Sequence, residues 1–296
     1  MGKIKVATGH LQGCFGCHIA LLDMHEEIIP LLEVLDIVRS PINDVKDIVE
    51  SDLGILDGSV CNTENERVAR EFRKKSKKIF ALGTCAALGG INGLRNLFGL
   101  GEVLKRSYLE NESTVEGFVP SSEDIPRMLP HVSALHQVID VDYTLPGCPP
   151  TPGMIKAALT AIISGREPEV PTKNLCHECS RTHKEMYVPK REFITDNVNS
   201  IMELEEIRSD VCFLEQGVVC LGPATREGCE ARCVKGNTPC RGCMGPTPDA
   251  LEQGAKMINA LATILPAGAM MFREDVVGLG YRYSMPVSII PCKDMK

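Results

Sequence analysis

The chain has 296 residues, of which 44% are hydrophobic and 24% are charged, and its formal net charge at pH 7 is −7. This length allows two domains with ordinary cores, and the acidic balance excludes an extended nucleic-acid-binding surface. No apolar stretch reaches the roughly 20 residues that span a bilayer, and no signal-peptide core precedes the first strand-like run, so we expect a cytoplasmic protein without membrane or nucleic-acid partners.

Short apolar runs alternate with helical patterns through the first half of the chain. The strand-like runs are Ile4–Thr8, Leu35–Arg39, Leu53–Leu56, Ile79–Leu82 and Val138–Leu145. The helical patterns are the spacing of apolar residues from Ile19 to Ile29 and the segments Glu64–Lys75 and Met154–Ile163. This alternation predicts an α/β fold with a flavodoxin-like, doubly wound parallel sheet that has helices on both faces.

Two changes in pattern mark the organisation of the chain. Residues Gly89–Gln137 interrupt the alternation with many Gly, Pro, Ser and Glu, which indicates a surface excursion or partner-binding lobe. From Val170 onward, Cys, Gly and Pro are dense and apolar periodicity is weak, so this part needs a metal or covalent staple to stay folded. We therefore predict a flavodoxin-like domain over residues 1–168 and an irregular, cysteine-rich domain over residues 169–296.

Cysteine usage is the strongest chemical signal. Of the fourteen cysteines, twelve sort into three groups of four, and each group contains one Cys-x-x-Cys pair. Those pairs are Cys14/Cys17, Cys176/Cys179 and Cys240/Cys243. Disulfides are disfavoured in a reducing cytoplasm, whereas four thiolates are what a cubane iron–sulfur cluster takes from its protein. Cys61 and Cys292 fall outside the groups, and we expect them to be small buried apolar residues.

The first group falls at one edge of the predicted sheet. Cys14 and Cys17 follow the first strand, and Cys85 and Cys148 each come shortly after a later strand. Because the carboxyl ends of parallel strands share the edge at which ligands bind, these four residues are expected to meet. The loop from Asp57 to Cys61 lies at the same edge. A thioredoxin-like redox pair or a zinc site remains the alternative at this point.

The C-terminal half carries the other eight cysteines within 68 residues, from Cys176 to Cys243. Two zinc ribbons would fit the number, but zinc ribbons usually show two Cys-x-x-Cys knuckles per site. Here each presumed site has one such pair and irregularly spaced partners. This pattern favours iron–sulfur clusters over zinc.

Six motifs together resemble the small subunit of [NiFe] hydrogenases over nearly the whole chain. They are Gly13-Cys14-x-Gly16-Cys17-His18, Asp57-Gly58-Ser59, Gly83-Thr84-Cys85-Ala86, Leu145-Pro146-Gly147-Cys148-Pro149-Pro150, Cys220-x-Gly222-Pro223-x-Thr225-x-x-x-Cys229 and Pro239-Cys240-x-Gly242-Cys243. The resemblance implies three [4Fe-4S] clusters and their ligands. The proximal cluster would take Cys14, Cys17, Cys85 and Cys148; the medial cluster Cys229, Cys233, Cys240 and Cys243; and the distal cluster Cys176, Cys179, Cys212 and Cys220.

Three departures from the family pattern change these expectations. Cys176 stands where many members have a histidine ligand, which implies an all-cysteine distal site with His177 as a neighbour. Cys233 stands where many members have a proline, which implies a four-iron medial cluster. Asp57 replaces a common glutamate; it could pass protons toward the active site, approach the proximal cluster as an oxygen ligand, or cap backbone amides.

The resemblance implies a function in electron transfer. Hydrogen would be split at a nickel–iron centre in a separate large subunit, and this chain would pass the electrons through its three clusters to a small [2Fe-2S] protein or a flavoprotein. The motifs are most similar to the cytoplasmic archaeal-type group and, within it, to the viologen-reducing, non-deazaflavin-reducing enzyme that feeds heterodisulfide reductase. Alternatives are the deazaflavin-reducing hydrogenase, the sulfhydrogenase, a related quinone-reductase subunit and a structural zinc-binding assembly module.

Overall fold

The computed structural model describes residues 2–43, 45–182, 207–216, 218–264, 275–290 and 292–293. The chain divides into two compact units. Unit 1 comprises Met1–Glu169 and Tyr283–Lys296, and unit 2 comprises Val170–Arg282. The C-terminal segment therefore belongs with the first unit, although it follows the second in sequence. The assignment of one cluster to the first unit and two clusters to the second stays a prediction.

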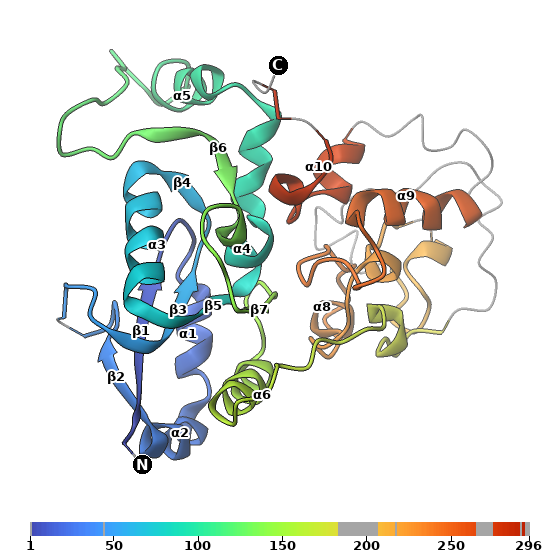
Figure 1. The fold of residues 1–296 in the computed structure, drawn as a ribbon. Coiled ribbons are helices and arrows are strands. Elements are labelled where there is room, and N and C mark those ends of the chain that lie inside the picture. Colours follow the sequence, from blue (N-terminus) through green and yellow to red (C-terminus); the bar gives the residue numbers. More distant parts are fainter. Residues whose placement is uncertain are drawn as a thin grey trace. The chain divides into compact units, whose positions relative to one another are not determined.

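Unit 1 is built on a five-stranded parallel sheet (Figure 1). Its strands are β1 (Ile4–His10), β2 (Leu35–Arg39), β3 (Ser51–Asp57), β5 (Ser76–Leu82) and β7 (Tyr143–Leu145). They run side by side in the order β2-β1-β3-β5-β7, with parallel pairing throughout. In chain order this is the 2-1-3-4-5 arrangement of flavodoxin-like sheets. The predicted fold class is confirmed.

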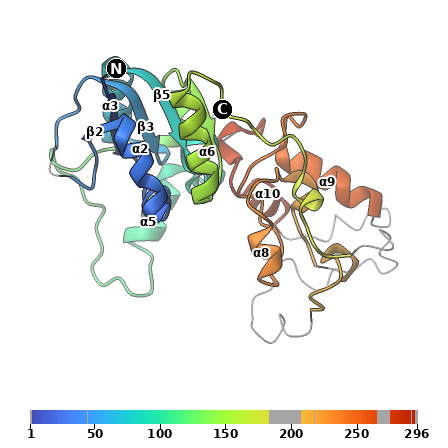
Figure 2. The ribbon, with the colours of Figure 1, turned by 90° about the horizontal axis from the view of Figure 1, so that it is seen from below.

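Helices cover both faces of this sheet (Figures 1 and 2). One face packs against α1 (Gly16–Leu22), α2 (Ile29–Val34) and α6 (Pro152–Ile163). The opposite face packs against α3 (Thr63–Lys75) and α4 (Gly83–Leu88). Successive strand residues alternate between the two cores, since Val6 belongs to the first and Ala7 to the second. Burial on both faces explains why the strands appear in the sequence as short, continuous apolar runs.

Helix α3 shows how the sequence sets its own boundaries. The Asn62 side chain accepts a hydrogen bond from the Asn65 backbone N–H at 2.8 Å and so caps the first turn. Acidic residues occupy the first turn and basic residues the last, which suits the helix dipole. Ala69 and Phe72 are fully buried against the sheet. The helix predicted from Glu64 to Lys75 is present with one further residue at its start.

Two predicted elements are shorter than expected. The single helix expected from Ile19 to Ile29 ends at Leu22, and a 3-10 turn, η1 (His25–Ile28), precedes α2. His25 has a positive φ of 49°, which breaks the helical path, and Pro30 suits only the first turn of a new helix. In the last predicted strand, only Tyr143–Leu145 pairs. Val138 instead donates its N–H to the Leu135 carbonyl within a turn.

The predicted excursion contains regular structure that the sequence did not indicate. Strand β6 (Met128–Ser133) pairs antiparallel with β4 (Val60–Asn62) to form a second, two-stranded sheet. Between β5 and β6 lie η2 (Ile91–Leu97) and α5 (Leu100–Tyr108), which is seen at the edge of the ribbon in Figure 1. The segment η3 (Leu135–Gln137) then leads back to β7.

Unit 2 is made of short helices and turns. They are η4 (Leu175–His177), η5 (Leu214–Gln216), η6 (Gly222–Ala224), α8 (Arg232–Lys235), α9 (Gln253–Ile264) and α10 (Val276–Gly280), while η8 (Met285–Val287) belongs to unit 1. The described residues of unit 2 form isolated β-bridges but no strand. Its apolar core includes Cys220 and Cys240 and is flanked by three further cysteines. Across the described parts of both units, every helix is too short or too polar to span a bilayer.

Candidate metal centres

Four thiols meet at the carboxyl edge of the parallel sheet. Cys14, Cys17, Cys85 and Cys148 line one hollow of about 300 Å³, a volume that includes the solvent at its mouth. Cys14 lies in the loop before α1, Cys17 lies in the first turn of α1, Cys85 lies in α4, and Cys148 follows β7. The structure therefore brings together residues that are more than 60 positions apart, as the strand-edge argument predicted.

The backbone around this hollow requires glycine at two positions. Gly83 has a φ of 84°, and a Cβ there would overlap the Cys17 sulfur. Gly90 has a φ of 65°, and a Cβ there would lie 2.5 Å from the Cys85 sulfur. Positive φ is accessible to glycine at little cost, and the missing side chain leaves the space that the thiols occupy.

Burial and mutual proximity disfavour thiolates here when no cation is bound. Burial raises the pKa of Cys85 to about 12, helped by Cys148, Cys14 and Asp57 in that order. Burial also raises the pKa of Cys17, with Asp57 as the next cause. A bound cation reverses this preference, because it stabilises thiolates and releases their protons. The donor set and the hollow between the thiols thus fit a positively charged, multi-atom metal group.

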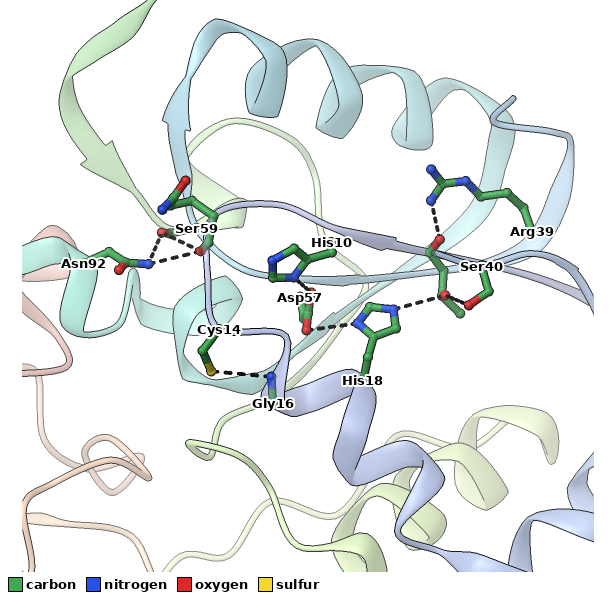
Figure 3. Close-up of polar contacts among 11 residues, drawn as sticks. His10, Cys14, Gly16, His18, Arg39, Ser40, Asp57, Ser59 and Asn92 are labelled. Atoms are coloured by element: carbon green, nitrogen blue, oxygen red, sulfur yellow. Dashed lines mark hydrogen bonds and ion pairs between the residues drawn. The ribbon is translucent and has the colours of Figure 1, made fainter. Parts of the chain in front are cut away.

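A buried carboxylate that lines the hollow contacts two histidines (Figure 3). Asp57, the last residue of β3, is 2% exposed, and its oxygens lie 2.6 Å from His10 Nδ1 and 3.0 Å from His18 Nδ1. Burial opposes ionisation of Asp57, but the contacts with His10 and His18 outweigh it and lower the pKa of the carboxyl. His18 Nε2 continues the contacts to Thr8 Oγ1 at 3.1 Å.

His10 is a site residue that the sequence reasoning missed. It ends β1 directly opposite Asp57 in the sheet register, so the contact follows from parallel pairing of the two strands. The available signal was a histidine at the carboxyl end of a strand adjacent to the one that ends in Asp57. His10 and Asp57 thus form a hydrogen-bonded polar edge of the hollow, and His18 contacts Asp57 from behind it (Figure 3).

The two unassigned cysteines lie outside the lining of the four-thiol hollow, although Cys61 is near enough to Cys85 to interact with it electrostatically. Cys61, in β4, is 2% exposed, and its sulfur lies 3.3 Å from Ser59 Oγ. Cys292 is partly buried near the C-terminus. Neither residue lines the hollow.

In unit 2, the cysteines of the expected distal site are also neighbours. Burial raises the pKa of Cys176 to about 12, and the further causes are the nearby Cys220, Cys212 and Cys179. A Cβ at Gly222 would lie 3.2 Å from the Cys176 sulfur and 3.7 Å from the Cys220 sulfur. The structure thus gathers these four thiols from η4 and the residues after it, and from the residues just before η5 and η6.

A buried arginine lies beside this second group. Arg181 is 5% exposed and stacks over the Phe213 ring, with its guanidinium carbon 3.8 Å from the ring centroid. Its Nη1 donates to the carbonyls of Arg208 at 2.6 Å and Val211 at 2.8 Å. Burial lowers the pKa of Arg181, and the nearby cysteine sulfurs, Cys179 first, act against that shift. The sequence reasoning missed this residue, because a single arginine carries no motif.

The four cysteines of the expected medial group contact one another within two pairs. Among the described residues, electrostatic contacts link Cys229 with Cys233 and Cys240 with Cys243. Cys240 also touches the second group, since its N–H donates to the Cys220 sulfur at 3.3 Å. Cys240 therefore connects one pair of the expected medial group with the expected distal group.

His177 contacts charged residues. Its Nδ1 lies 2.8 Å from Glu227 and its Nε2 lies 2.9 Å from Lys173 Nζ. More than half of the His177 side chain is exposed. Both ring nitrogens thus face side chains on the surface of unit 2.

Comparison with known proteins covers both units. The family model described as "NADH ubiquinone oxidoreductase, 20 Kd subunit" matches residues 14–162, which lie in unit 1. A subunit of the F420-non-reducing hydrogenase of Methanothermobacter thermautotrophicus is 40% identical over 308 residues, covering 99% of this chain and 98% of that relative. The match to this relative therefore includes the cysteine-rich unit 2.

Two solved structures are similar to this chain over different shares of its length. A chain of an NAD+-reducing [NiFe]-hydrogenase is 38% identical, with a TM-score of 0.55, over 57% of this chain and 96% of its own length. A chain of the [NiFeSe]-hydrogenase of Dm. baculatum is 20% identical, with a TM-score of 0.51, over 84% of this chain and 97% of its own length. The second likeness concerns the fold alone.

Proposed function

Because the chain belongs to the small subunits of [NiFe] hydrogenases, in the group of the F420-non-reducing enzymes, we propose that it carries electrons through three [4Fe-4S] clusters to an acceptor linked to heterodisulfide reductase. As a small subunit, it pairs with a large subunit that holds the nickel–iron site, and it transfers electrons by means of iron–sulfur clusters. The number of clusters, their ligands and the acceptor are our proposal.

The four-thiol hollow of unit 1 carries this proposal most directly. Its cysteines converge at the ligand-binding edge of a flavodoxin-like sheet, and glycine at positions 83 and 90 leaves room for their sulfurs. Four thiolates are the usual ligand set of a cubane cluster. We assign Cys14, Cys17, Cys85 and Cys148 to the proximal cluster.

The eight cysteines of unit 2 support two further clusters. Cys176, Cys179, Cys212 and Cys220 lie close enough to affect one another electrostatically, and we assign them to the distal cluster. We assign Cys229, Cys233, Cys240 and Cys243 to the medial cluster, supported by the contacts within each of its two pairs. Cys233 supplies the fourth thiolate that a four-iron cluster needs.

Asp57 is our candidate for moving protons beside the proximal site. It lies among the residues that line the hollow, and its oxygens lie 2.6 Å from His10 Nδ1 and 3.0 Å from His18 Nδ1, distances short enough for proton transfer. The alternative role, an oxygen ligand to the proximal cluster, would replace one of these histidine contacts with a bond to iron.

The choice of acceptor depends on family membership. Full-length similarity to an F420-non-reducing enzyme favours the heterodisulfide-reductase-linked group, reached through a small [2Fe-2S] protein or a flavoprotein, over deazaflavin-reducing and sulfhydrogenase enzymes. We also propose that the complex works in the cytoplasm. The quinone-reductase alternative accounts for unit 1 alone, since its family model stops at residue 162.

Anaerobic purification of the native complex tests the proposal. We expect a brown protein with broad absorption near 400 nm and about twelve irons per copy of this chain. A colourless, zinc-containing chain would instead support the assembly-module alternative. Identification of the co-purified chains tests the acceptor: heterodisulfide reductase subunits are expected, and a deazaflavin-binding subunit in their place would contradict that assignment.

A further inference from the structure

Glu178 connects the two cysteine groups of unit 2. It lies between Cys176 and Cys179 in sequence, yet its carboxylate points to the loop that carries Cys229. One oxygen, Oε1, accepts hydrogen bonds from the Gly228 N–H at 3.1 Å and the Ala231 N–H at 3.2 Å. The same oxygen lies 3.8 Å from the Cys229 sulfur. The segment Cys176–Cys179 therefore supplies two thiols to the expected distal site and a carboxylate to the expected medial site.

Backbone hydrogen bonds hold the two segments in this register. The Leu175 N–H donates to the Thr225 carbonyl at 2.8 Å, and the Glu227 N–H donates to the Lys173 carbonyl at 3.0 Å. Gly228 and Ala231 both have positive φ, at 113° and 50°. This turn directs two amides toward one point, as in an anion-binding nest, and the Glu178 carboxylate fills it.

A carboxylate in this position acts on a neighbouring cluster in two ways. Its negative charge disfavours the additional electron of the reduced cluster. It also competes with the Cys229 sulfur for the Ala231 amide, which contacts both groups, and amide hydrogen bonds to ligand sulfur raise the reduction potential. Both effects of the carboxylate therefore lower the reduction potential of the cluster.

We propose that Glu178 is a positioning residue whose carboxylate lowers the reduction potential of the cluster held by Cys229, Cys233, Cys240 and Cys243. The inference rests on the proposed function, because it requires that cluster to be present. Arg181 presents the opposite charge to the other group, beside Cys179, Cys212 and Cys220. Within unit 2, the medial site thus has an anionic neighbour and the distal site a cationic one, which favours electron flow from the first to the second.

Two substitutions separate the two effects of the carboxylate. Glu178→Gln removes the charge and keeps an oxygen that accepts from the amides, whereas Glu178→Ala removes both. Glu230→Gln is the matched control: Glu230 lies next to Cys229, but its side chain is 63% exposed and pairs with Arg232. Each variant is purified as the anaerobic complex, its iron is measured, and its clusters are titrated with EPR detection.

The expected result is a positive shift in the reduction potential of the medial cluster alone. For Glu178→Gln, that cluster should be reduced more readily by a factor on the order of ten at a given potential, or about 59 mV for one electron. Glu178→Ala should shift it further, and Glu230→Gln should leave all potentials unchanged.

Three results would overturn the inference. They are unchanged potentials with full iron content, an equal shift in Glu230→Gln, and loss of the cluster from both Glu178 variants, which would make the residue a structural support only. A wild-type complex without three clusters would instead refute the proposed function, so the two failures are distinguishable.

Discussion

The two units of this chain reach a folded state by different means. Unit 1 has a parallel sheet with a separate apolar core on each face, and its strands pair over most of their length. The described part of unit 2 has short turns, a core that includes cysteines and a buried arginine bonded to backbone carbonyls. We expect regular hydrogen bonding to stabilise the first unit without a cofactor, whereas the described residues of the second have too little regular structure to do so. Iron should therefore matter far more to the folding of unit 2.

Removal of iron should have the largest effect. In the apo chain, we expect unit 2 to unfold while the sheet of unit 1 persists, because the free energy of metal binding is also folding free energy where little regular structure holds the ligands together. Hydrogen exchange of the full-length chain before and after anaerobic chelation measures this difference. Backbone amides from Val218 to Gly245 should lose protection, and those of β1, β3 and β5 should retain it. If the amides of both units kept their protection after chelation, unit 2 would not depend on iron more than unit 1 does.

Arg181→Met should be the most damaging single substitution in unit 2. Methionine preserves part of the apolar contact with Phe213 but removes the charged donor shared by the carbonyls of Arg208 and Val211, which then keep only Gln216 Nε2, and it also removes the contact with Asn237. We expect unit 2 to lose about 3 kcal/mol of stability. Denaturant unfolding of the holo-protein, followed by loss of cluster absorbance, measures it. As a control, Arg208→Met removes an exposed arginine and should cost less than about 0.5 kcal/mol.

Gly83→Ala should damage the metal site of unit 1 while leaving its sheet folded. The positive φ at this position costs an L-residue about 1–2 kcal/mol, and overlap with the Cys17 sulfur adds to this, so we expect a loss of about 3 kcal/mol. Iron analysis should show about eight irons in place of about twelve. Gly153→Ala is the matched control: it lies in α6 with open space around it and should gain about 0.5 kcal/mol. Full iron content in Gly83→Ala would count against the assigned proximal ligands.

Asp57→Asn should have a smaller effect that depends on pH. The pKa of Asp57 in the folded state lies below its ordinary value. The ionised carboxylate therefore adds to the free energy of unfolding above about pH 4, and this contribution is lost as pH falls through the folded-state pKa. We expect the substitution to cost unit 1 about 2 kcal/mol at pH 7 and progressively less below pH 4. Denaturant unfolding at several pH values measures this difference. Asp36→Asn, an exposed change on β2, should show neither effect.

The regular half of the fold could be predicted from the sequence because its physical causes are local. Apolar runs such as Leu53–Leu56 and the capped, charged pattern of α3 specify their own structure, and the edge of the sheet then places Cys85 and Cys148. The pairing of β4 with β6 could not be predicted, since it joins short segments from Val60 and Met128 across the excursion. Nothing local in either segment specifies its partner.

In the candidate sites, sequence spacing identified the thiols but not their surroundings. The Cys-x-x-Cys pairs are visible because thiols at that spacing are rare without a ligand. The contacts of His10, Glu178 and Arg181 depend on which segments lie side by side, a property of the tertiary fold. The charges that should tune the clusters therefore became apparent only in the structure.

Anomalous X-ray scattering at the iron edge, from crystals of the anaerobic complex, tests the central claim most directly. Three separate iron positions should appear in this chain, one among Cys14, Cys17, Cys85 and Cys148 and two among the eight cysteines of unit 2. Fewer than three iron positions, or signal at the zinc edge in their place, would contradict it.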